Sequence, residues 1–181
     1  EKTLVGNKLE SSVKAPDAVL LDSDKKTEPG PESRRRLISG RIAEGLRFDG
    51  KDDSVTIPDA DSSLTTPVAL TVSACVYKDS ADGNGLQDII VKQGKEDSGI
   101  VYRLALGFDK TEKVFKPAFI LNPGGSSSVI SIESRNPLPA DRFTLLTATW
   151  EKKTGKMKLY MDGVEQPLKE EQEFTKELLS S

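Results

Sequence analysis

Hydrophobic and polar residues alternate along most of the chain from about residue 45 onward. Between residues 70 and 77 two sets of residues alternate. One set is apolar and consists of Leu70, Val72, Ala74 and Val76. The other set is more polar on the whole and consists of Thr71, Ser73, Cys75 and Tyr77. Successive residues of a strand point to opposite faces, whereas a helix would repeat its apolar positions every three or four residues. The pattern therefore predicts β-strands.

The same alternation predicts several further strands, all rich in Val, Ile, Thr and aromatic residues. They are residues 46–48, 55–57, 88–92, 100–108, 113–121, 129–133, 142–150 and 156–161. Turn-forming pairs such as Asp49-Gly50, Thr154-Gly155 and Asp162-Gly163 separate them. Short strands with no convincing helix between them predict an all-β fold, an antiparallel two-sheet β-sandwich.

Two segments break the alternation. Residues 22–40 are charged and contain Pro29, Gly30 and Pro31, which predicts a polar loop or linker. For residues 167–181 two interpretations stay open, a short helix or an irregular edge segment. We therefore expect an N-terminal strand or extension over 1–21, a sandwich core over 41–166 and a tail from 167 onward.

Composition agrees with a folded domain. The 181 residues are 35% hydrophobic and 30% charged, and no apolar run approaches the length that inserts into a membrane. The formal charge of −3 does not favour a nucleic-acid partner, which needs a basic surface. Because the sequence begins with Glu1, we expect a piece of a larger polypeptide or a chain from which a leader was removed. Cys75, the only cysteine, is interpreted as a small core residue.

Histidine is absent from the sequence. The usual general base, the usual ligand of transition metals and the partner of catalytic serine or cysteine are therefore missing. Only carboxylate or lysine chemistry is left for an enzyme.

Several segments resemble the laminin-G-like (LamG) jelly roll of the concanavalin A-like lectin/glucanase superfamily, and they occur in the same order along the chain as in that family. They are GLRFDGKDDSVTIPDADSSL (45–64), TVSACVY (71–77), DIIVKQG (88–94) and PLPADRFTLLTATWEKKTGKMKLYMDGVE (137–165). The resemblance covers roughly residues 40–166 and implies a binding or adhesion domain. The last segment is the most specific, since it resembles the family's long strand, glycine-centred turn and L-Y-x-D-G ending.

Two departures from the family pattern stand out. Cys75 occupies a position where the family often has tryptophan. The glycine-rich and I-D-E/D-V-type strands that usually follow the L-Y-x-D-G hairpin are not recognisable in the closing EFTKELLSS. A longer parent chain, a partner strand or a divergent tail are the three explanations for this ending.

Some members of the superfamily hydrolyse glycosides, which requires two carboxylates about 5–5.5 Å apart in retaining enzymes. A strand supplies such a pair at positions i and i+2 or i+4. That spacing is absent here, since Glu133 and Glu151 each stand alone on their strands. We therefore predict that the chain is not an enzyme.

Calcium binding is a separate hypothesis. The stretch DSADGNGLQD supplies the oxygen ligands Asp79, Asp82, Asn84 and Asp88, with glycines that let the backbone curl. A second acidic stretch contains Asp52, Asp53, Asp59 and Asp61. The alternative is that these residues only form turns.

For a glycan ligand, the candidate residues are exposed tyrosines and one small polar loop. Trp150, Phe143, Phe48 and Phe108 fit core positions, so Tyr77 and Tyr102 are the better surface aromatics, along with Tyr160. Asn122 and Ser126 lie in the loop NPGGSSS, which suits hydrogen bonding to a sugar or a peptide. Packing and an ordinary loop connection are the alternatives.

The leading hypothesis is a carbohydrate-binding or adhesion module that binds a glycan with the loops at the rim of the sandwich, with or without Ca²⁺. It would act outside the cytoplasm: extracellular, at the cell surface or in the periplasm. A second hypothesis is a structural or protein–protein interaction domain that a partner strand completes. A glycoside hydrolase is the third.

Overall fold

The fold was analysed in a computed structural model. It describes residues 4–5, 8–9, 18–21, 37–41, 44–48, 53–58, 68–79, 84–94, 99–122 and 129–170. All regular structure in these residues is strand, and every pairing is antiparallel. They contain no helix that could cross a membrane. The predicted all-β, antiparallel two-sheet sandwich is confirmed.

The chain divides into two units, residues 1–64 and 65–181, which we describe separately. In the first unit, β1 (Leu4–Val5), β2 (Lys8–Leu9), β3 (Ala18–Leu21) and β6 (Ser54–Thr56) form one sheet in that order. A second pairing joins β4 (Leu37–Ser39) to β5 (Glu44–Leu46). Strand β4 lies inside residues 22–40, the stretch predicted as a polar loop. The predicted domain boundaries stay predictions.

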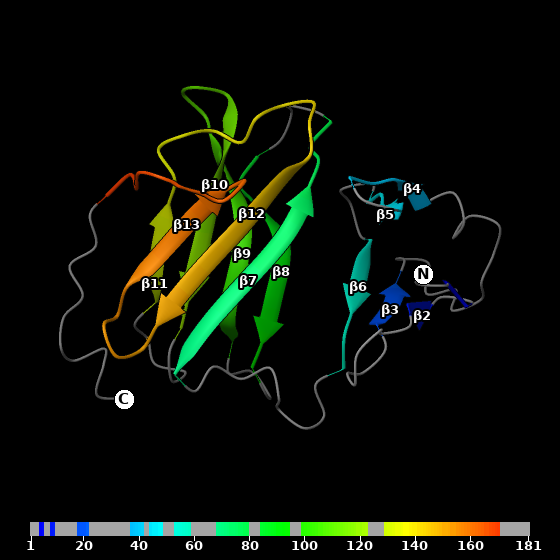
Figure 1. Cartoon of the computed structure of the whole chain (residues 1–181), viewed down its shortest axis with the longest axis horizontal. Coiled ribbons are helices and arrows are strands. Elements are labelled where there is room, and N and C mark those ends of the chain that lie inside the picture. The colour runs from blue at the N-terminus through cyan, green and yellow to red at the C-terminus, as the bar shows by residue number, and fades with distance from the viewer. Residues whose placement is uncertain are drawn as a thin grey trace. The chain divides into compact units, whose positions relative to one another are not determined.

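The second unit is the sandwich, with two four-stranded sheets (Figure 1). One sheet has the order β11-β10-β9-β8, and the other has the order β14-β13-β12-β7. The strands are β7 (Ala69–Val76), β8 (Leu86–Gln93), β9 (Ile100–Asp109), β10 (Val114–Leu121), β11 (Ile130–Glu133), β12 (Thr144–Glu151), β13 (Met157–Met161) and β14 (Val164–Glu165). Each lies within a few residues of a predicted strand, apart from the two-residue β14.

The core lies between these two sheets and follows the period-two alternation. Its buried members come from the inner faces of both sheets: Val72, Leu104, Leu106, Phe115, Phe119, Leu121, Ile132, Leu146, Ala148, Trp150 and Leu159 among them. In β12, Leu146 and Ala148 are fully buried, whereas Leu145 between Thr144 and Leu146 is 38% exposed. Burial along this strand is therefore one-sided, with its inner face in the core and its outer face more exposed.

A tight hairpin turn joins β13 to β14 at Asp162-Gly163. Both residues have positive φ, 51° and 82°. This is the backbone of a two-residue hairpin of the kind that Asp-Gly favours. The predicted turn is confirmed, and Asp162 Oδ1 additionally accepts a hydrogen bond from the backbone N–H of Leu145 (3.0 Å).

After β14 the chain crosses from one sheet to the outer edge of the other. The backbone N–H of Arg135 donates to the carbonyl of Pro167, and the N–H of Lys169 donates to that of Glu133, both at 2.8 Å. Between them Ser134 and Leu168 form an antiparallel bridge. Of the two interpretations of the tail, the part over 167–170 is an edge segment, and residues 171–181 lie outside the described residues.

Three aromatic or cysteine placements differ from expectation. Cys75 is exposed, because it shares the outer face of β7 with Thr71 and Ser73. Phe48 is 46% exposed and lies beyond the end of β5. Tyr102 is only 7% exposed, because it shares the inner face of β9 with Leu104 and Leu106. By contrast, Trp150 is buried in the core as predicted.

Candidate functional site

The predicted calcium ligands all belong to the β7–β8 connection and the strand that follows it. Asp79 and Asn84 are exposed, and Asp82 lies outside the described residues. Asp88 is on β8, with its Oδ1 2.8 Å from Nε of Arg103 on β9, so this carboxylate has a cationic partner. Among the side chains that the structure describes, no group of three or more acidic or cysteine residues is gathered around a metal position.

The predicted glycan contacts do not converge. Tyr77 follows β7 and is exposed, with its ring centroid 5.2 Å from that of Phe143. The backbone N–H of Asn122, which follows β10, donates to the carbonyl of Val101 near the start of β9, at the end of these two strands away from the β9–β10 turn. Tyr102 is in the core, and Ser126 lies outside the described residues. Their roles as ligands stay predictions, but Tyr77, Tyr102 and Asn122, the three that the structure describes, do not share one surface.

A different group of side chains surrounds a shallow, open hollow of about 510 Å³ at the end of the sandwich where β9 turns into β10. We call it the rim hollow. It is lined by Phe108, Asp109, Lys110, Thr111, Glu112, Glu133 and Lys169. The end of β9 supplies Phe108 and Asp109, and the turn after it supplies Lys110, Thr111 and Glu112. The end of β11 supplies Glu133, and the crossing tail supplies Lys169.

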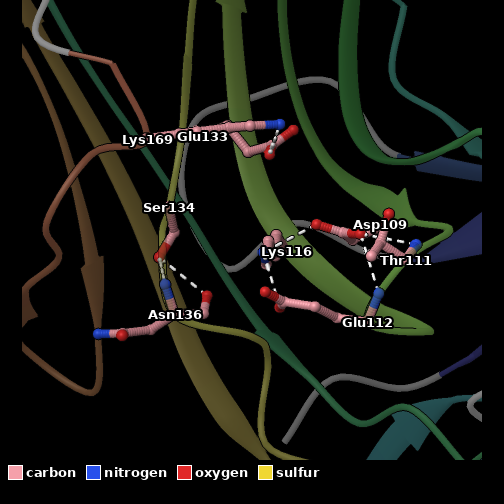
Figure 2. Close-up of polar contacts among 8 residues, drawn as sticks. All are labelled: Asp109, Thr111, Glu112, Lys116, Glu133, Ser134, Asn136 and Lys169. Carbon is pink, nitrogen blue, oxygen red and sulfur yellow. Dashed lines mark hydrogen bonds and ion pairs between the residues drawn. The ribbon is translucent and has the colours of Figure 1, made fainter.

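Lys116 connects the turn to the sheet beneath it (Figure 2). Its Nζ lies 2.9 Å from Oδ2 of Asp109 and 2.8 Å from Oε2 of Glu112. Although Lys116 is on the outer face of β10, its side chain is only 7% exposed. One ammonium therefore holds two carboxylates of the rim hollow, and the turn folds back over its own strand.

Asp109 also organises the backbone of this turn. Its Oδ1 accepts hydrogen bonds from the backbone N–H groups of Thr111 (2.9 Å) and Glu112 (3.1 Å). The hydrogen bond from Lys116 and the one from the Glu112 amide lower the pKa of Asp109 from 3.8 to about 2. The same contacts, with Glu112 first and Asp109 second, raise the pKa of Lys116 above its ordinary value. These two groups are therefore charged at neutral pH.

The opposite side of the rim hollow is formed by a second ion pair. Nζ of Lys169 lies 3.2 Å from Oε1 of Glu133 (Figure 2). Gly107 makes room for this carboxylate, since a Cβ at that position would lie 3.2 Å from Oε2 of Glu133. Nearby, Ser134 Oγ bonds to the backbone of Asn136, whose side chain donates to Oε1 of Gln166 (2.9 Å). These bonds fix the crossing tail that carries Lys169.

The charges around the rim hollow balance. Its lining carries the carboxylates of Asp109, Glu112 and Glu133 and the ammonium groups of Lys110 and Lys169. Lys116, which lies beneath the turn and contacts Asp109 and Glu112, supplies the third positive charge. The ring of Phe108 adds an apolar patch, and Thr111 adds a hydroxyl. Counted together with Lys116, the hollow offers many hydrogen bonds and no net formal charge, which suits a neutral polyhydroxyl ligand better than an ion.

The sequence patterns did not identify this group. Asp109, Glu112 and Lys116 occur within eight residues around a predicted turn, so their spacing was a usable signal for a local ion network. Glu133 and Lys169 are 36 residues apart and meet only because the tail crosses to β11. No local pattern encodes that second contact.

Comparison with known protein families assigns the sandwich to one of them. A family model described as the concanavalin A-like lectin/glucanases superfamily, Laminin_G_3, matches residues 49–175. The match spans well over half of the chain, and the chain belongs to this family. Its resemblance to a laminin-G-like domain is thereby confirmed, and membership indicates a binding module in general terms. No curated protein matches the chain.

Proposed function

We propose that this chain is a non-catalytic carbohydrate-binding module and that the rim hollow receives a neutral glycan. The observation that carries the proposal is the pairing of every carboxylate in the hollow with an ammonium group. A glycan would hydrogen-bond to these pre-positioned groups and lay a C–H face on Phe108. Pre-positioned partners reduce the entropy that binding would otherwise cost.

The charge state of Asp109 argues against this residue as the general acid of a glycosidase. A glycosidase needs one carboxyl group whose pKa is raised, so that it can act as a general acid near neutral pH. The pKa of Asp109 is instead lowered to about 2 by Lys116 and backbone amides. The family description names both lectins and glucanases, so this point is specific to the residues of this chain.

The β7–β8 connection extends this proposal to calcium. Nζ of Lys78 lies 4.8 Å from the ring centroid of Phe115, and the N–H of Phe108 donates to the carbonyl of Gly85. The connection that carries Asp79 and Asn84 therefore begins and ends beside the β9–β10 turn. A Ca²⁺ ion bound there would stiffen the rim next to the hollow.

A laminin-G-like binding module of this kind would work outside the cytoplasm, and we propose an extracellular, cell-surface or periplasmic location. Its ligand would be a glycan of the surrounding matrix or surface, or a glycosylated protein. Fold membership alone does not select among these, because function resides in sites rather than folds.

A glycan-array screen of the purified chain tests the carbohydrate proposal, followed by calorimetric titration of the hits. We expect binding to neutral oligosaccharides that changes little between low and moderate salt, since the hollow carries no net charge. A parallel titration with a chelator tests whether Ca²⁺ assists binding. If the chelator leaves the glycan affinity unchanged, the calcium proposal is rejected and the carbohydrate proposal is not affected. Absence of binding to every neutral glycan would overturn the carbohydrate proposal.

A second candidate function, a protein–protein interaction domain, is favoured by one observation: among the described pairings, the eight-residue β7 is the outermost strand of its sheet. Edge strands accept additional strands through backbone hydrogen bonds. A binding partner of this type would be recovered by pull-down with the folded domain and lost when the β7 edge is altered, while glycan binding would persist.

A further inference from the structure

The Asn84-Gly85 pair, just before β8, brings a side-chain amide next to an unhindered backbone nitrogen. Gly85 has a φ of 65°, and a Cβ built there would meet no atom within 4 Å. Because glycine has no side chain, its nitrogen can approach the Cγ of the preceding residue more closely than that of any other residue. The two groups are joined by the chain, so their reaction is intramolecular and needs no encounter between separate molecules. Asn84 is also exposed, which gives water access to any product.

The other asparagines of the sequence lack this arrangement. Asn122 and Asn136 each precede a proline, whose nitrogen carries no hydrogen and cannot act as the nucleophile. Asn7 lies outside the described residues and precedes Lys8, whose side chain crowds the approach. The residue that follows each asparagine therefore singles out Asn84.

The Asp162-Gly163 turn shows how the fold can oppose the corresponding reaction at an aspartate. Asp162 Oδ1 accepts a hydrogen bond from the N–H of Leu145 (3.0 Å), and Oδ2 lies 3.0 Å from Nη2 of Arg142. Ring closure at this carboxyl group would expel one of its two oxygens and would therefore break one of these contacts. Among the described residues, no hydrogen bond or ion pair holds the side chain of Asn84 in a comparable way.

We propose that Asn84 is a site of spontaneous deamidation, with water as the only co-reactant. Asparagine is among the thermolabile residues of proteins. The Gly85 nitrogen forms a bond to Cγ of Asn84, and the side-chain nitrogen takes up the Gly85 proton and leaves as ammonia. The product is a succinimide ring. The proposal is separate from the carbohydrate proposal and does not depend on it.

Water then opens the ring at either of its two carbonyl carbons. Opening at Cγ releases the Gly85 nitrogen from the side chain and leaves aspartate. Opening at the main-chain carbonyl leaves isoaspartate, in which the backbone runs through the former side chain. In both products a neutral amide has been replaced by a carboxylate, so the chain gains one negative charge.

Deamidation at this position alters a contact of the rim hollow. The carbonyl of Gly85 accepts a hydrogen bond from the backbone N–H of Phe108 at 2.9 Å. Phe108 is part of the lining of the rim hollow. Isoaspartate lengthens the backbone by one methylene group directly before Gly85. We therefore expect the isoaspartate form, and not the aspartate form, to weaken this hydrogen bond.

Peptide mass spectrometry of the full chain, after incubation in mildly alkaline buffer, tests the site. We expect the peptide that contains Asn84 to yield aspartate and isoaspartate, and in water enriched in heavy oxygen each product should carry one heavy oxygen atom. Asn122 and Asn136 should stay intact in the same sample and serve as internal controls. Gly85→Ala should slow the reaction by about tenfold or more, since a Cβ hinders the attacking nitrogen.

Asn84→Gln is the matched variant, because its longer side chain cannot close the same ring and should remain unmodified. An intact Asn84 in the folded native chain would overturn the proposal. Deamidation at Asn136 as fast as at Asn84 would overturn it as well, since proline cannot supply the attacking nitrogen.

Hydrogen exchange of the Phe108 amide tests the structural consequence. We compare the separated isoaspartate form with Asn84→Asp, which adds the same charge without the extra backbone atom. Exchange at Phe108 should be faster in the isoaspartate form by about tenfold or more and close to native in Asn84→Asp. Equal exchange in the two forms would contradict the predicted weakening of the bond between Gly85 and Phe108.

Discussion

Lys116 illustrates how one side chain can set the electrostatics of the rim hollow. Its stem is buried on the outer face of β10, and its ammonium contacts Asp109 and Glu112. A lysine is rarely buried without such partners, because the charge must be compensated when water is removed. The two carboxylates supply that compensation and at the same time fix the turn above the strand.

The lowered pKa of Asp109 predicts a pH dependence of stability. The unfolded value is 3.8 and the folded value about 2, so the ionised carboxylate stabilises the fold above about pH 4, and this contribution is lost as the pH falls towards 2. Asp109→Asn should therefore flatten the decline of the urea midpoint over this range. Lys116→Met should have a similar effect, because it removes the main cause of the lowered pKa.

Lys158→Met is the control for this experiment. Lys158 also contacts a carboxylate, Glu165 at 2.7 Å, and that contact raises its pKa. It lies on β13 in the other sheet. A flattening of the pH profile by Lys158→Met equal to that of Lys116→Met would contradict the assignment to Asp109.

Neighbouring leucines on β12 give a second prediction. Leu146 is fully buried and Leu145 is 38% exposed. Leu146→Ala should lower the free energy of unfolding by about 3 kcal/mol or more, because it removes core contacts and leaves a cavity. Leu145→Ala should cost less than about 1 kcal/mol. Urea unfolding measures both, and equal losses would contradict the one-sided burial of this strand.

At the scale of single residues, the alternation in the sequence identified which residues share a face, and the inner face of β7 was predicted correctly. Cys75 and Tyr102 also follow this alternation, and not the usual burial of their residue types. Cys75 is in phase with Thr71 and Ser73 and is exposed, whereas Tyr102 is in phase with Leu104 and Leu106 and is buried. Both placements follow from strand parity, which outweighs the average behaviour of the residue type.

Among the elements, the β13–β14 hairpin depends most directly on one glycine. Gly163 has φ of 82°, and a Cβ there would meet no atom within 4 Å. Gly163→Ala should therefore destabilise the fold by about 1 kcal/mol through backbone strain and not through a clash.

Gly163→Asn is the matched comparison, since asparagine adopts positive φ more readily than alanine. We expect it to retain more stability than Gly163→Ala in thermal or urea unfolding. If alanine is tolerated as well as asparagine, the strain argument fails.

The elements were largely predictable because hydrophobic and polar residues alternate within each strand, and because Gly, Asn or Asp residues mark the turns between strands. Their long-range pairings were not predictable in the same way. The crossing of residues 166–169 to β11 depends on backbone bonds to Glu133 and Arg135, and on Asn136 and Gln166, which are far apart in sequence. For this reason the rim hollow, which needs Lys169 beside Glu133, was not foreseen.

For the whole molecule, family membership and the two-sheet sandwich define the scaffold, and the proposed activity depends on one end of it. Two Lys–Glu pairs of this sandwich allow that claim to be tested against a matched control. Lys169–Glu133 lines the rim hollow, whereas Lys158–Glu165 joins β13 to β14 in the other sheet. Exposed ion pairs contribute little to stability, so both double variants should stay folded.

The most direct test of the central claim is calorimetric titration of a glycan bound by the native chain against these two double variants. Glu133→Gln with Lys169→Met should weaken binding by about tenfold or more, because hydrogen bonds from charged groups to the sugar are lost. Lys158→Met with Glu165→Gln should bind as tightly as the native chain. Native affinity in the first variant, or an equal loss in both, would contradict a glycan site in the rim hollow.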